Sequence, residues 1–347
     1  MLRRAAALLA WTAALFAGAA PHGARALGAE SAVVFAYGRF GEDEAPNVSI
    51  RLDQFEAHLE ELTDGGYTVM PLPAILEALR AGRPLPEGAV ALTIDEASRS
   101  AYREAWPRLR AAGLPVTLFV APDPVDRGSP SHMSWDEIRR MASDRGVTIG
   151  GLGASGLSLA QRPEAEVRAE LRRMEERILA ELGRRPALLA YPQGEQSLAL
   201  HEIVEERMES GAFGGALGQQ SGVLHRAADR RSLPRFMMNE AFGSVERFRL
   251  AAGALPLPVS ELAPEDPLLS VNPPALGFTV SEEVGDLSRL ACFASGQGRA
   301  SLERLGERRI EVRLRDPFPP GRARVNCTLP AADGHWRWFG VQFVIPE

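Results

Sequence analysis

The sequence is poor in cysteine and histidine, and it has no block of basic residues and no internal repeat. Its 347 residues include only two cysteines, Cys292 and Cys327, and six histidines. Leaving out residues 1–26, which carry three arginines and no acid, takes the net charge from −6 to −9. Phosphate contacts need clustered lysine and arginine, so this acidic chain is not expected to bind nucleic acid. In an oxidising compartment the cysteines could form one disulfide, and two separate thiols are the alternative.

Beyond its first residues, the chain has no apolar run near the length of a membrane span. The run at residues 5–20 follows Arg3 and Arg4 and precedes the small-x-small pattern Ala24-Arg25-Ala26. Its length of about 16 residues is below the roughly 20 that a membrane-spanning helix needs. Residues 1–26 are therefore predicted to be a secretory signal that is cleaved, which leaves a periplasmic or secreted protein without a stable membrane span.

Short apolar runs alternate with amphipathic stretches in residues 31–252. Helical spacing of apolar residues predicts helices over 52–62 and 163–182, and Ser134 with Glu137 forms a capping box that begins another. The apolar runs predict strands over 31–37, 67–70, 89–94, 116–120, 147–149, 187–191, 212–215 and 233–236. This alternation indicates an α/β domain around a parallel sheet, either doubly wound or closed as a barrel.

The composition and pattern of the sequence change after residue 252. Six prolines fall within 253–275, which we interpret as a linker. The residues that follow, 276–347, contain short β-like runs separated by turn residues, which indicates a small antiparallel β-sandwich. The expected strands of this second domain are 277–280, 290–294, 309–314, 324–329 and 336–344.

Four short segments could carry chemistry. Asp95 and Glu96 follow the predicted strand 89–94, and catalytic groups of barrel enzymes lie at such strand ends. The other three read Tyr-Gly-Arg-Phe at 37–40, Thr-Ile-Gly-Gly-Leu-Gly-Ala-Ser-Gly-Leu-Ser-Leu at 148–159, and Ala-Tyr-Pro-Gln-Gly at 190–194. In these segments the chain resembles the polysaccharide deacetylases (carbohydrate esterase family 4, the NodB homology domain).

The resemblance implies a distorted (β/α)7-type barrel and metal-assisted hydrolysis of an N- or O-acetyl group on a sugar polymer. Asp95 takes the place of the family's base, and Glu96 that of a metal-binding aspartate. Leu152 and Gly156 stand where the family has its two metal-binding histidines, and Gly38 replaces a third histidine. Leucine and glycine offer no side-chain lone pair, so the Asp-His-His metal site is degraded.

The later motifs are better preserved. The resemblance makes Tyr191, Pro192 and Gly194 part of the substrate groove. The Tyr191 ring is expected to stack on or hydrogen-bond a sugar, and its backbone N–H corresponds to an oxyanion donor of the family. A late Leu-Pro-Arg-Phe element implies that Arg235 steadies the catalytic aspartate. The structural alternative is that the prolines of these motifs serve barrel turns whatever the chemistry.

A metal site could be rebuilt from other histidines. Those of the barrel region are His58, His132, His201 and His225. His58 falls inside a predicted helix, and His225 is expected nearest the barrel mouth. We interpret each as a surface histidine. If the motif frame is correct, replacing Leu152 and Gly156 together by histidine restores metal affinity.

Trp336 and Trp338 alternate with Arg337 near the end of the chain, so both rings are expected on one sheet face. They form either a platform for sugar rings or a surface that packs against the barrel or a second sheet.

Taken together, these features predict an exported polysaccharide deacetylase homologue that binds or acts on acetylated cell-envelope or extracellular glycan. It is expected to be catalytically weak or inactive and to hold no cofactor. One alternative is an active N- or O-deacetylase that binds zinc or another divalent metal through a non-standard ligand set. Another is a purely structural envelope module. The predicted partners are acetylated polysaccharide or a polysaccharide-processing enzyme.

Overall fold

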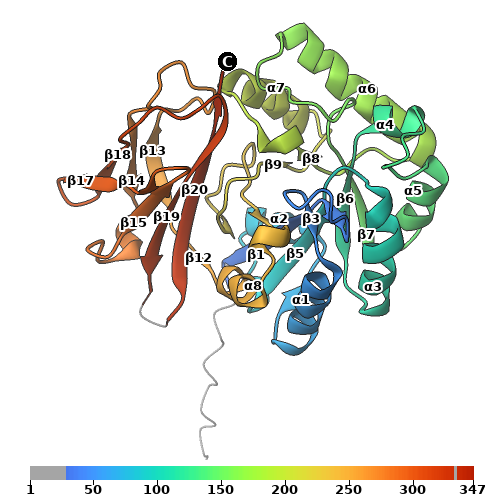
Figure 1. Ribbon diagram of the computed structural model, residues 1–347, viewed down its shortest axis with the longest axis horizontal. Coiled ribbons are helices and arrows are strands. Elements are labelled where there is room, and N and C mark those ends of the chain that lie inside the picture. The colour runs from blue at the N-terminus through green and yellow to red at the C-terminus, as the bar shows by residue number, and fades with distance from the viewer. Residues whose placement is uncertain (1–28, 332–333) are drawn as a thin grey trace, which may run out of the picture.

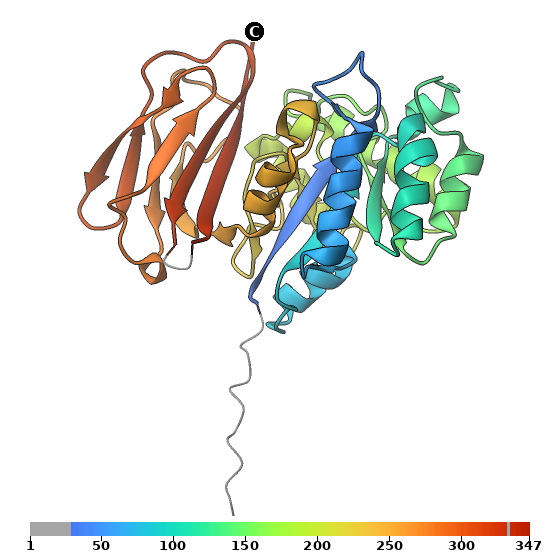
Figure 2. The same cartoon turned by 60° about the horizontal axis from the view of Figure 1, so that its bottom comes forward.

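The computed structural model describes residues 29–331 and 334–347. The predicted signal at 1–26 lies outside the described residues. Two bodies lie side by side: an α/β domain and, after residue 252, a domain built of strands (Figures 1 and 2). Among the helices that the structure describes, none is long and apolar enough to cross a membrane.

The α/β domain is built on one mostly parallel sheet. The strand order is β10-β1-β5-β6-β7-β8-β9, with β11 beside β1 and β4 beside β5. Only β10 is antiparallel to its neighbour. The bounds are β1 (Ser31–Tyr37), β4 (Thr68–Val69), β5 (Ala89–Ile94), β6 (Val116–Val120), β7 (Val147–Gly151), β8 (Leu189–Ala190), β9 (Ala216–Leu217), β10 (Leu224–His225) and β11 (Phe236–Met237).

The two edges of this sheet approach each other. Leu217 of β9 forms a parallel bridge with Leu233, and the chain runs from Leu233 into β11 beside β1. The sheet therefore curves into a barrel-like closure, as the resemblance implied. Strands β5 and β6 are buried along their whole length, which explains why they read as continuous apolar runs in the sequence.

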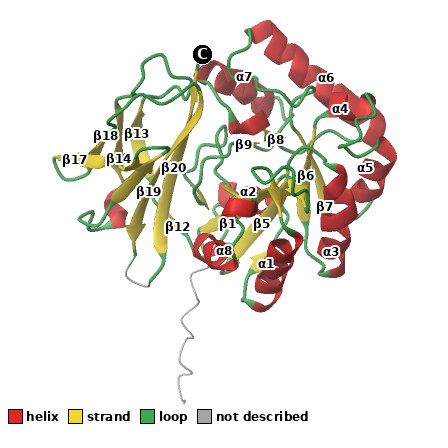
Figure 3. Cartoon of the chain, viewed as in Figure 1, coloured by secondary structure: helices red, strands yellow, loops and turns green. Residues whose placement is uncertain are grey.

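Helices cover the outside of this sheet (Figure 3). The α-helices are α1 (Leu52–Asp64), α2 (Leu72–Arg80), α3 (Trp106–Ala111), α4 (Pro122–Asp126), α5 (Trp135–Ala142), α6 (Glu164–Leu182), α7 (Leu198–Glu209) and α8 (Val245–Ala252). Short elements between them are β2 (Arg39–Phe40), β3 (Ser49–Ile50), η1 (Ala101–Ala105), η2 (Pro192–Gly194) and η3 (Glu240–Phe242). The predicted helices at 52–62 and 163–182 and the capping box of Ser134 are confirmed.

The second domain contains two sheets around its own apolar core. Their orders are β12-β20-β19-β15-β16 and β13-β14-β18-β17, and Phe278, Ile310, Val325 and Phe343 pack between them. The bounds are β12 (Leu255–Pro256), β13 (Val259–Ala263), β14 (Leu276–Val280), η4 (Glu282–Val284), β15 (Ala291–Ala294), β16 (Gly298–Arg299), β17 (Ser301–Leu305), β18 (Arg309–Arg313), β19 (Gly321–Pro330) and β20 (Trp336–Ile345).

A disulfide joins Cys292 on β15 to Cys327 on β19. The two residues are direct partners in the ladder between these strands, which brings their Cα atoms to 4.0 Å. Of the two alternatives that the sequence left open, the structure has the disulfide.

The proline-rich segment 253–275 is not a free linker. Its β12 pairs with β20 and its β13 pairs with β14, so the segment contributes a strand to each sheet of the second domain. The linker prediction is corrected in this respect: proline is excluded from central strands but is tolerated in short edge strands, and β12 and β13 are both edges.

Strand β20 faces the barrel and contributes to the contact between the two bodies. The Trp338 ring lies edge-on against Phe236 of β11, with 5.2 Å between ring centroids. At Gly340 a side chain would meet the backbone oxygen of Ser221 at 2.4 Å, so only glycine fits this contact. Trp336 is 36% exposed. For Trp338 the packing alternative therefore holds, and the two tryptophans do not form a shared open platform.

Candidate functional site

The carboxyl ends of β1, β5, β7 and β8 meet at one mouth of the barrel, and Asp95 lies there directly after β5. Its backbone N–H donates to the Tyr37 carbonyl at 2.8 Å. Its carboxylate receives two hydrogen bonds from the Arg235 guanidinium, at 2.8 and 3.0 Å. Asp95 is 5% exposed and Arg235 is fully buried. Such a two-pronged pair fixes the carboxylate in position and orientation.

Arg235 is in turn held by the barrel. Its Nε donates to the Gly218 carbonyl at 2.9 Å, and its Nη1 also reaches the Thr93 hydroxyl at 3.1 Å. The guanidinium lies 5.4 Å from the centroid of the Phe119 ring. The predicted contact between Arg235 and the family's catalytic aspartate is thus present, and it belongs to the core of the domain.

Glu96 lies beside Asp95 and has a different partner. Glu96 and Ala97 both have positive φ, +72° and +47°, a strained turn of the kind found at functional sites. The Glu96 carboxylate lies 3.5 Å from the Arg39 guanidinium, which also pairs with Glu42 at 3.0 Å. Ser100 donates to Glu42 as well. The Arg39 Nε is buried without a hydrogen-bond partner among the described residues. Arg39 therefore supplies the positive charge beside the carboxylate that stands where the family has a metal ligand.

Leu152 lies in an apolar cluster under the mouth. It is 3% exposed and packs in a cluster with Phe119, Leu188 and Leu217. A histidine placed here would put its ring nitrogens among hydrocarbon, where an unpaired polar group is costly.

Gly156 and Gly38 also resist a larger side chain. Gly156 has a φ of +71°, and a Cβ on it would lie 3.2 Å from the Ala121 side chain. A Cβ on Gly38 would lie 2.9 Å from the Val48 carbonyl oxygen. L-residues with side chains rarely adopt a positive φ such as that of Gly156. The sequence-based expectation that two histidines at 152 and 156 restore a metal site is therefore not supported by this backbone.

A carboxylate from α6 holds the loop after β7. Glu170 is 6% exposed and accepts hydrogen bonds from the Ser155 backbone N–H at 2.9 Å and from its hydroxyl at 2.8 Å. Arg173 bridges Glu170 and Asp123. Burial raises the pKa of Glu170, but the Ser155 hydrogen bonds and neighbouring arginines outweigh this and leave the pKa below its ordinary value. The loop that carries metal ligands in the family is here fixed by a carboxylate and arginines.

These donors do not fit the metal that the family resemblance implies. Within residues 29–331 and 334–347, no group of three histidine, cysteine, aspartate or glutamate side chains is placed to hold a metal ion. Catalytic zinc needs three protein ligands with free lone pairs directed at one point. The Asp95 carboxylate is directed at Arg235, and Glu96 at Arg39. We therefore derive no chemical step through a metal.

His58 is fully buried, so the prediction of a surface histidine is wrong for it. One ring nitrogen lies 3.0 Å from the Tyr37 hydroxyl and the other 2.8 Å from the Gly243 carbonyl oxygen. Its ring stacks on Phe248. Burial lowers the pKa of His58 to about 4. His201 is also buried, with its Nε2 2.8 Å from the Gln196 side chain. Both histidines serve the packing of the barrel.

The histidine near the mouth is His132, which the sequence did not single out. Its backbone forms a β-bridge with Ser98, just after the Asp95–Glu96 turn. Burial is the main cause that lowers the pKa of His132, and the positive charge of Arg39 lowers it further. His225, expected nearest the mouth, instead pairs with Ser31 at the amino end of β1. That expectation is wrong, because β10 returns to the opposite end of the barrel.

Tyr191 is fully buried, and its hydroxyl donates to the Arg231 carbonyl at 2.7 Å. Its backbone N–H donates to the Leu217 carbonyl at 2.9 Å. The predictions that its ring binds a sugar and that its N–H serves as an oxyanion donor are both wrong, because the ring is buried and both groups already have partners inside the barrel.

The turn after Tyr191 lies at the carboxyl end of β8, on the rim of the barrel mouth. Pro192 is buried, and a Cβ on Gly194 would lie 2.5 Å from the Gln219 side chain, so only glycine fits there. The Gln193 carbonyl accepts hydrogen bonds from Gln342 at 3.0 Å and from Arg322 at 3.2 Å, both in the second domain. The second domain thus fixes one side of the barrel mouth.

Known proteins resemble this chain in sequence. A family model for polysaccharide deacetylase matches residues 82–207. YxkH of Bacillus subtilis (strain 168), whose name assigns it to the polysaccharide deacetylases, is 28% identical over 201 residues, 55% of this chain and 68% of its own. A poly-beta-1,6-N-acetyl-D-glucosamine N-deacetylase of Escherichia coli (strain K12) is 29% identical over 124 residues, 31% of this chain but only 18% of its own.

Solved structures share the fold of the α/β domain. The Streptococcus pyogenes deacetylase PplD in complex with acetate has a TM-score of 0.58 at 19% identity, over 64% of this chain and 98% of its own. IcaB from Ammonifex degensii has a TM-score of 0.57 at 20% identity, over 65% of this chain and 98% of its own. The family match includes Asp95, Glu96 and Tyr191. Residues 82–207 therefore match the polysaccharide deacetylase family, and the α/β domain shares the fold of these solved structures.

Proposed function

We propose that the barrel mouth recognises an uncharged, N-acetylated polysaccharide and does not carry out metal-dependent hydrolysis. The observation that carries this proposal is the charge balance of the mouth. Asp95 is paired with Arg235, and Glu96 and Glu42 are paired with Arg39. Carboxylates that already have arginine partners attract a metal ion or a cationic polymer poorly, so the mouth suits a neutral ligand.

The retained geometry supports binding of such a ligand. Each Asp95 oxygen accepts one hydrogen bond from Arg235, so each keeps a lone pair for a sugar hydroxyl or amide N–H. Gln193 lies on the rim with its carbonyl held by the second domain. The names of the relatives support an N-acetylated glycan as the ligand class. The signal predicted at 1–26 supports a ligand in the cell envelope or outside the cell.

The test combines three measurements on one preparation of the protein. After dialysis against zinc, cobalt, nickel and manganese, elemental mass spectrometry is expected to find far less than one metal ion per chain. N-acetylglucosamine oligomers are expected to bind equally well with and without EDTA, and to release no acetate. Asp95→Asn and Glu96→Gln are expected to weaken binding. Glu176→Gln, on the exposed face of α6, is the matched control.

Two other outcomes would replace this function. One bound metal per chain that is lost in Glu96→Ala, with chelator-sensitive acetate release, would mean an active deacetylase with a non-standard ligand set. A folded protein that binds no acetylated oligomer at millimolar concentration would be a structural envelope module.

A further inference from the structure

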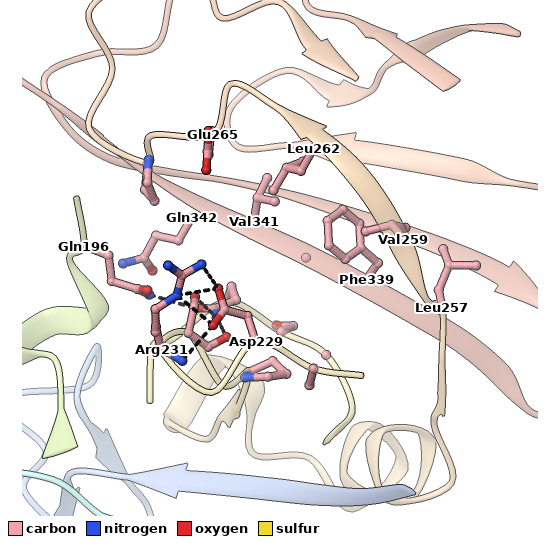
Figure 4. Close-up of a pocket in the computed structure, with 18 of the residues that line it drawn as sticks. Gln196, Asp229, Arg231, Leu257, Val259, Leu262, Glu265, Phe339, Val341 and Gln342 are labelled. Carbon is pink, nitrogen blue, oxygen red and sulfur yellow. Dashed lines mark hydrogen bonds and ion pairs between the residues drawn. The ribbon is translucent and has the colours of Figure 1, made fainter. Parts of the chain in front are cut away.

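A second hollow, separate from the mouth, lies between the barrel and the second domain. Its volume is about 580 Å³. Figure 4 shows apolar side chains of the second domain along one side, with Gln196, Asp229 and Arg231 of the barrel opposite them. We call this hollow the interdomain cleft. The apolar side chains that line it are Leu257, Val259, Leu262, Phe339 and Val341.

The polar side chains on the barrel side of the interdomain cleft already bond to one another. Gln196 lies between His201, at 2.8 Å, and Gln220, at 3.1 Å. Asp229 and Arg231 form an ion pair at 2.9 Å. A sugar binds through many side-chain donors and acceptors with free capacity, and these groups have little left. The side chains therefore do not favour a glycan.

The backbone of β20, unlike these side chains, has hydrogen-bonding groups without partners among the described residues. At one end of the cleft, Leu257 donates its N–H to the Trp338 carbonyl. At the other end, Val344 donates to the Pro267 carbonyl and accepts from the Leu269 N–H. The position beside this edge of β20 is thus filled by the chain at both ends. Between the two ends, the chain leaves this edge to form β13 in the other sheet.

Gly340 and Gln342 direct their backbone groups into this gap. Alternate residues of an antiparallel strand bond to the same side, so residues 340 and 342 face the same edge as 338 and 344. No hydrogen bond from the described loops or side chains reaches their N–H and C=O groups. The gap from 338 to 344 spans about 20 Å, at roughly 3.3 Å per residue. That length fits an extended peptide of four to six residues.

The cleft also has a preferred charge and side-chain pattern. Three carboxylates, Asp229, Glu261 and Glu265, line it together with one arginine, Arg231, a net charge of −2. A strand added here would direct alternate side chains toward the apolar core of the sandwich and toward the barrel. Apolar residues alternating with lysine or arginine match both surfaces.

We propose that the interdomain cleft binds an extended, basic segment of a partner protein, which adds a strand to the open edge of β20. Main-chain hydrogen bonds to Gly340 and Gln342 supply the recognition, and alternate apolar side chains insert beside Val341 and Phe339. This mode of binding uses a stretch of sheet edge that has no neighbouring strand among the described residues. It does not depend on the function proposed for the mouth.

The test uses the acetylated and amidated hexapeptide Lys-Val-Lys-Val-Lys-Val, with binding followed by chemical-shift changes around Trp338. Two further peptides carry N-methyl groups, one on the lysine amides and one on the valine amides. Because only alternate amides of an added strand face β20, we expect one methylated peptide to bind at least about tenfold more weakly and the other to bind normally. A peptide with its lysines and valines in two blocks is expected not to bind.

Two protein variants locate the binding. Gln342→Pro removes an N–H at the open edge, and Gln342→Ala makes the same side-chain loss while keeping that N–H. We expect peptide affinity to fall at least about tenfold in the first relative to the second. If Gln342→Pro does not fold, the methylated peptides still test on the wild-type protein whether the peptide pairs with β20 as a strand. No peptide binding, equal effects of the two methylations, or displacement of the peptide by N-acetylglucosamine oligomers would overturn the proposal.

Discussion

The two halves of the barrel mouth have changed to different degrees from the pattern that the family resemblance implies. The half at β5 and β11 keeps Asp95 and its partner Arg235, both buried. The half at β1 and β7 has Gly38, Leu152 and Gly156 in the places of three histidines. The first pair is part of the core, so losing either member would leave a buried charge unpaired. The metal-ligand positions hold no such ion pair, and in this chain packing around Leu152 and the ion pairs of Arg39 take their place.

The largest effect is expected from removing the cation in the half of the mouth that keeps the Asp95–Arg235 pair. Arg235→Met leaves the Asp95 carboxylate buried without a partner, and we expect a loss of about 3–5 kcal/mol in the free energy of unfolding. Urea denaturation measures it. Arg83→Met removes an arginine from an exposed pair with Glu77 and is expected to cost at most about 1 kcal/mol. Similar losses in both variants would contradict a core role for Arg235.

The buried histidine His58 gives a test by pH. Its pKa is lowered to about 4 in the folded protein, against about 6.5 when unfolded. The folded state therefore binds this proton less well, so stability is full above pH 6.5 and falls as the pH is lowered toward 4, by up to about 3 kcal/mol. Because burial also lowers the pKa of His201 and His225, the informative quantity is the difference between wild type and His58→Gln.

Urea denaturation between pH 7 and 4.5 measures that difference. His58→Gln is expected to be less stable at pH 7 but to lose less stability on acidification. An unchanged slope in His58→Gln would show that this histidine does not stay neutral in the fold.

The rebuilt half of the mouth depends on Glu170. Glu170→Ala removes both hydrogen bonds to Ser155, and we expect a loss of about 1–3 kcal/mol and faster hydrogen exchange at the Ser155 amide. Because the folded pKa of Glu170 is lowered, its contribution is present above its unfolded pKa and is lost as the pH falls through the folded value. The difference between variant and wild type should therefore shrink in acid.

The control for this prediction lies on the same helix. Glu176→Ala, at an exposed position of α6, is expected to change stability by no more than about 0.5 kcal/mol and to leave exchange at Ser155 unaltered. Unaltered exchange in Glu170→Ala itself would mean that packing alone holds the loop.

Much of the fold could be predicted because its signals are local. Strands β1, β5 and β6 have the predicted bounds, since each is a continuous buried apolar run. Strand β9 was placed four residues too early because it has only two residues and follows two glycines. Strand β17 was missed because four of its five residues are exposed. An element without an apolar pattern of its own is fixed only by its neighbours.

The site was less predictable because its contacts join distant parts of the chain. The motif located Asp95 and Arg235, and their pairing spans 140 residues. The pair of Arg39 with Glu96 spans 57 residues and has no sequence pattern. Tyr191 was misassigned because a motif gives the position of a residue but not whether its side chain faces the core or the groove.

The other half of the mouth is tested through Arg39, which pairs with Glu42 and Glu96. In Arg39→Met the carboxylates of Glu42 and Glu96 lose their cation, and because the pairs are partly exposed we expect a loss of only about 0.5–1 kcal/mol. The variant should, however, gain stability when zinc or calcium is added, because a bound cation now offsets the repulsion between the two carboxylates. Wild type and Arg39→Met/Glu96→Gln should not respond, and differential scanning fluorimetry distinguishes the three. An equal response in wild type would mean that Arg39 does not replace a metal ion at this mouth.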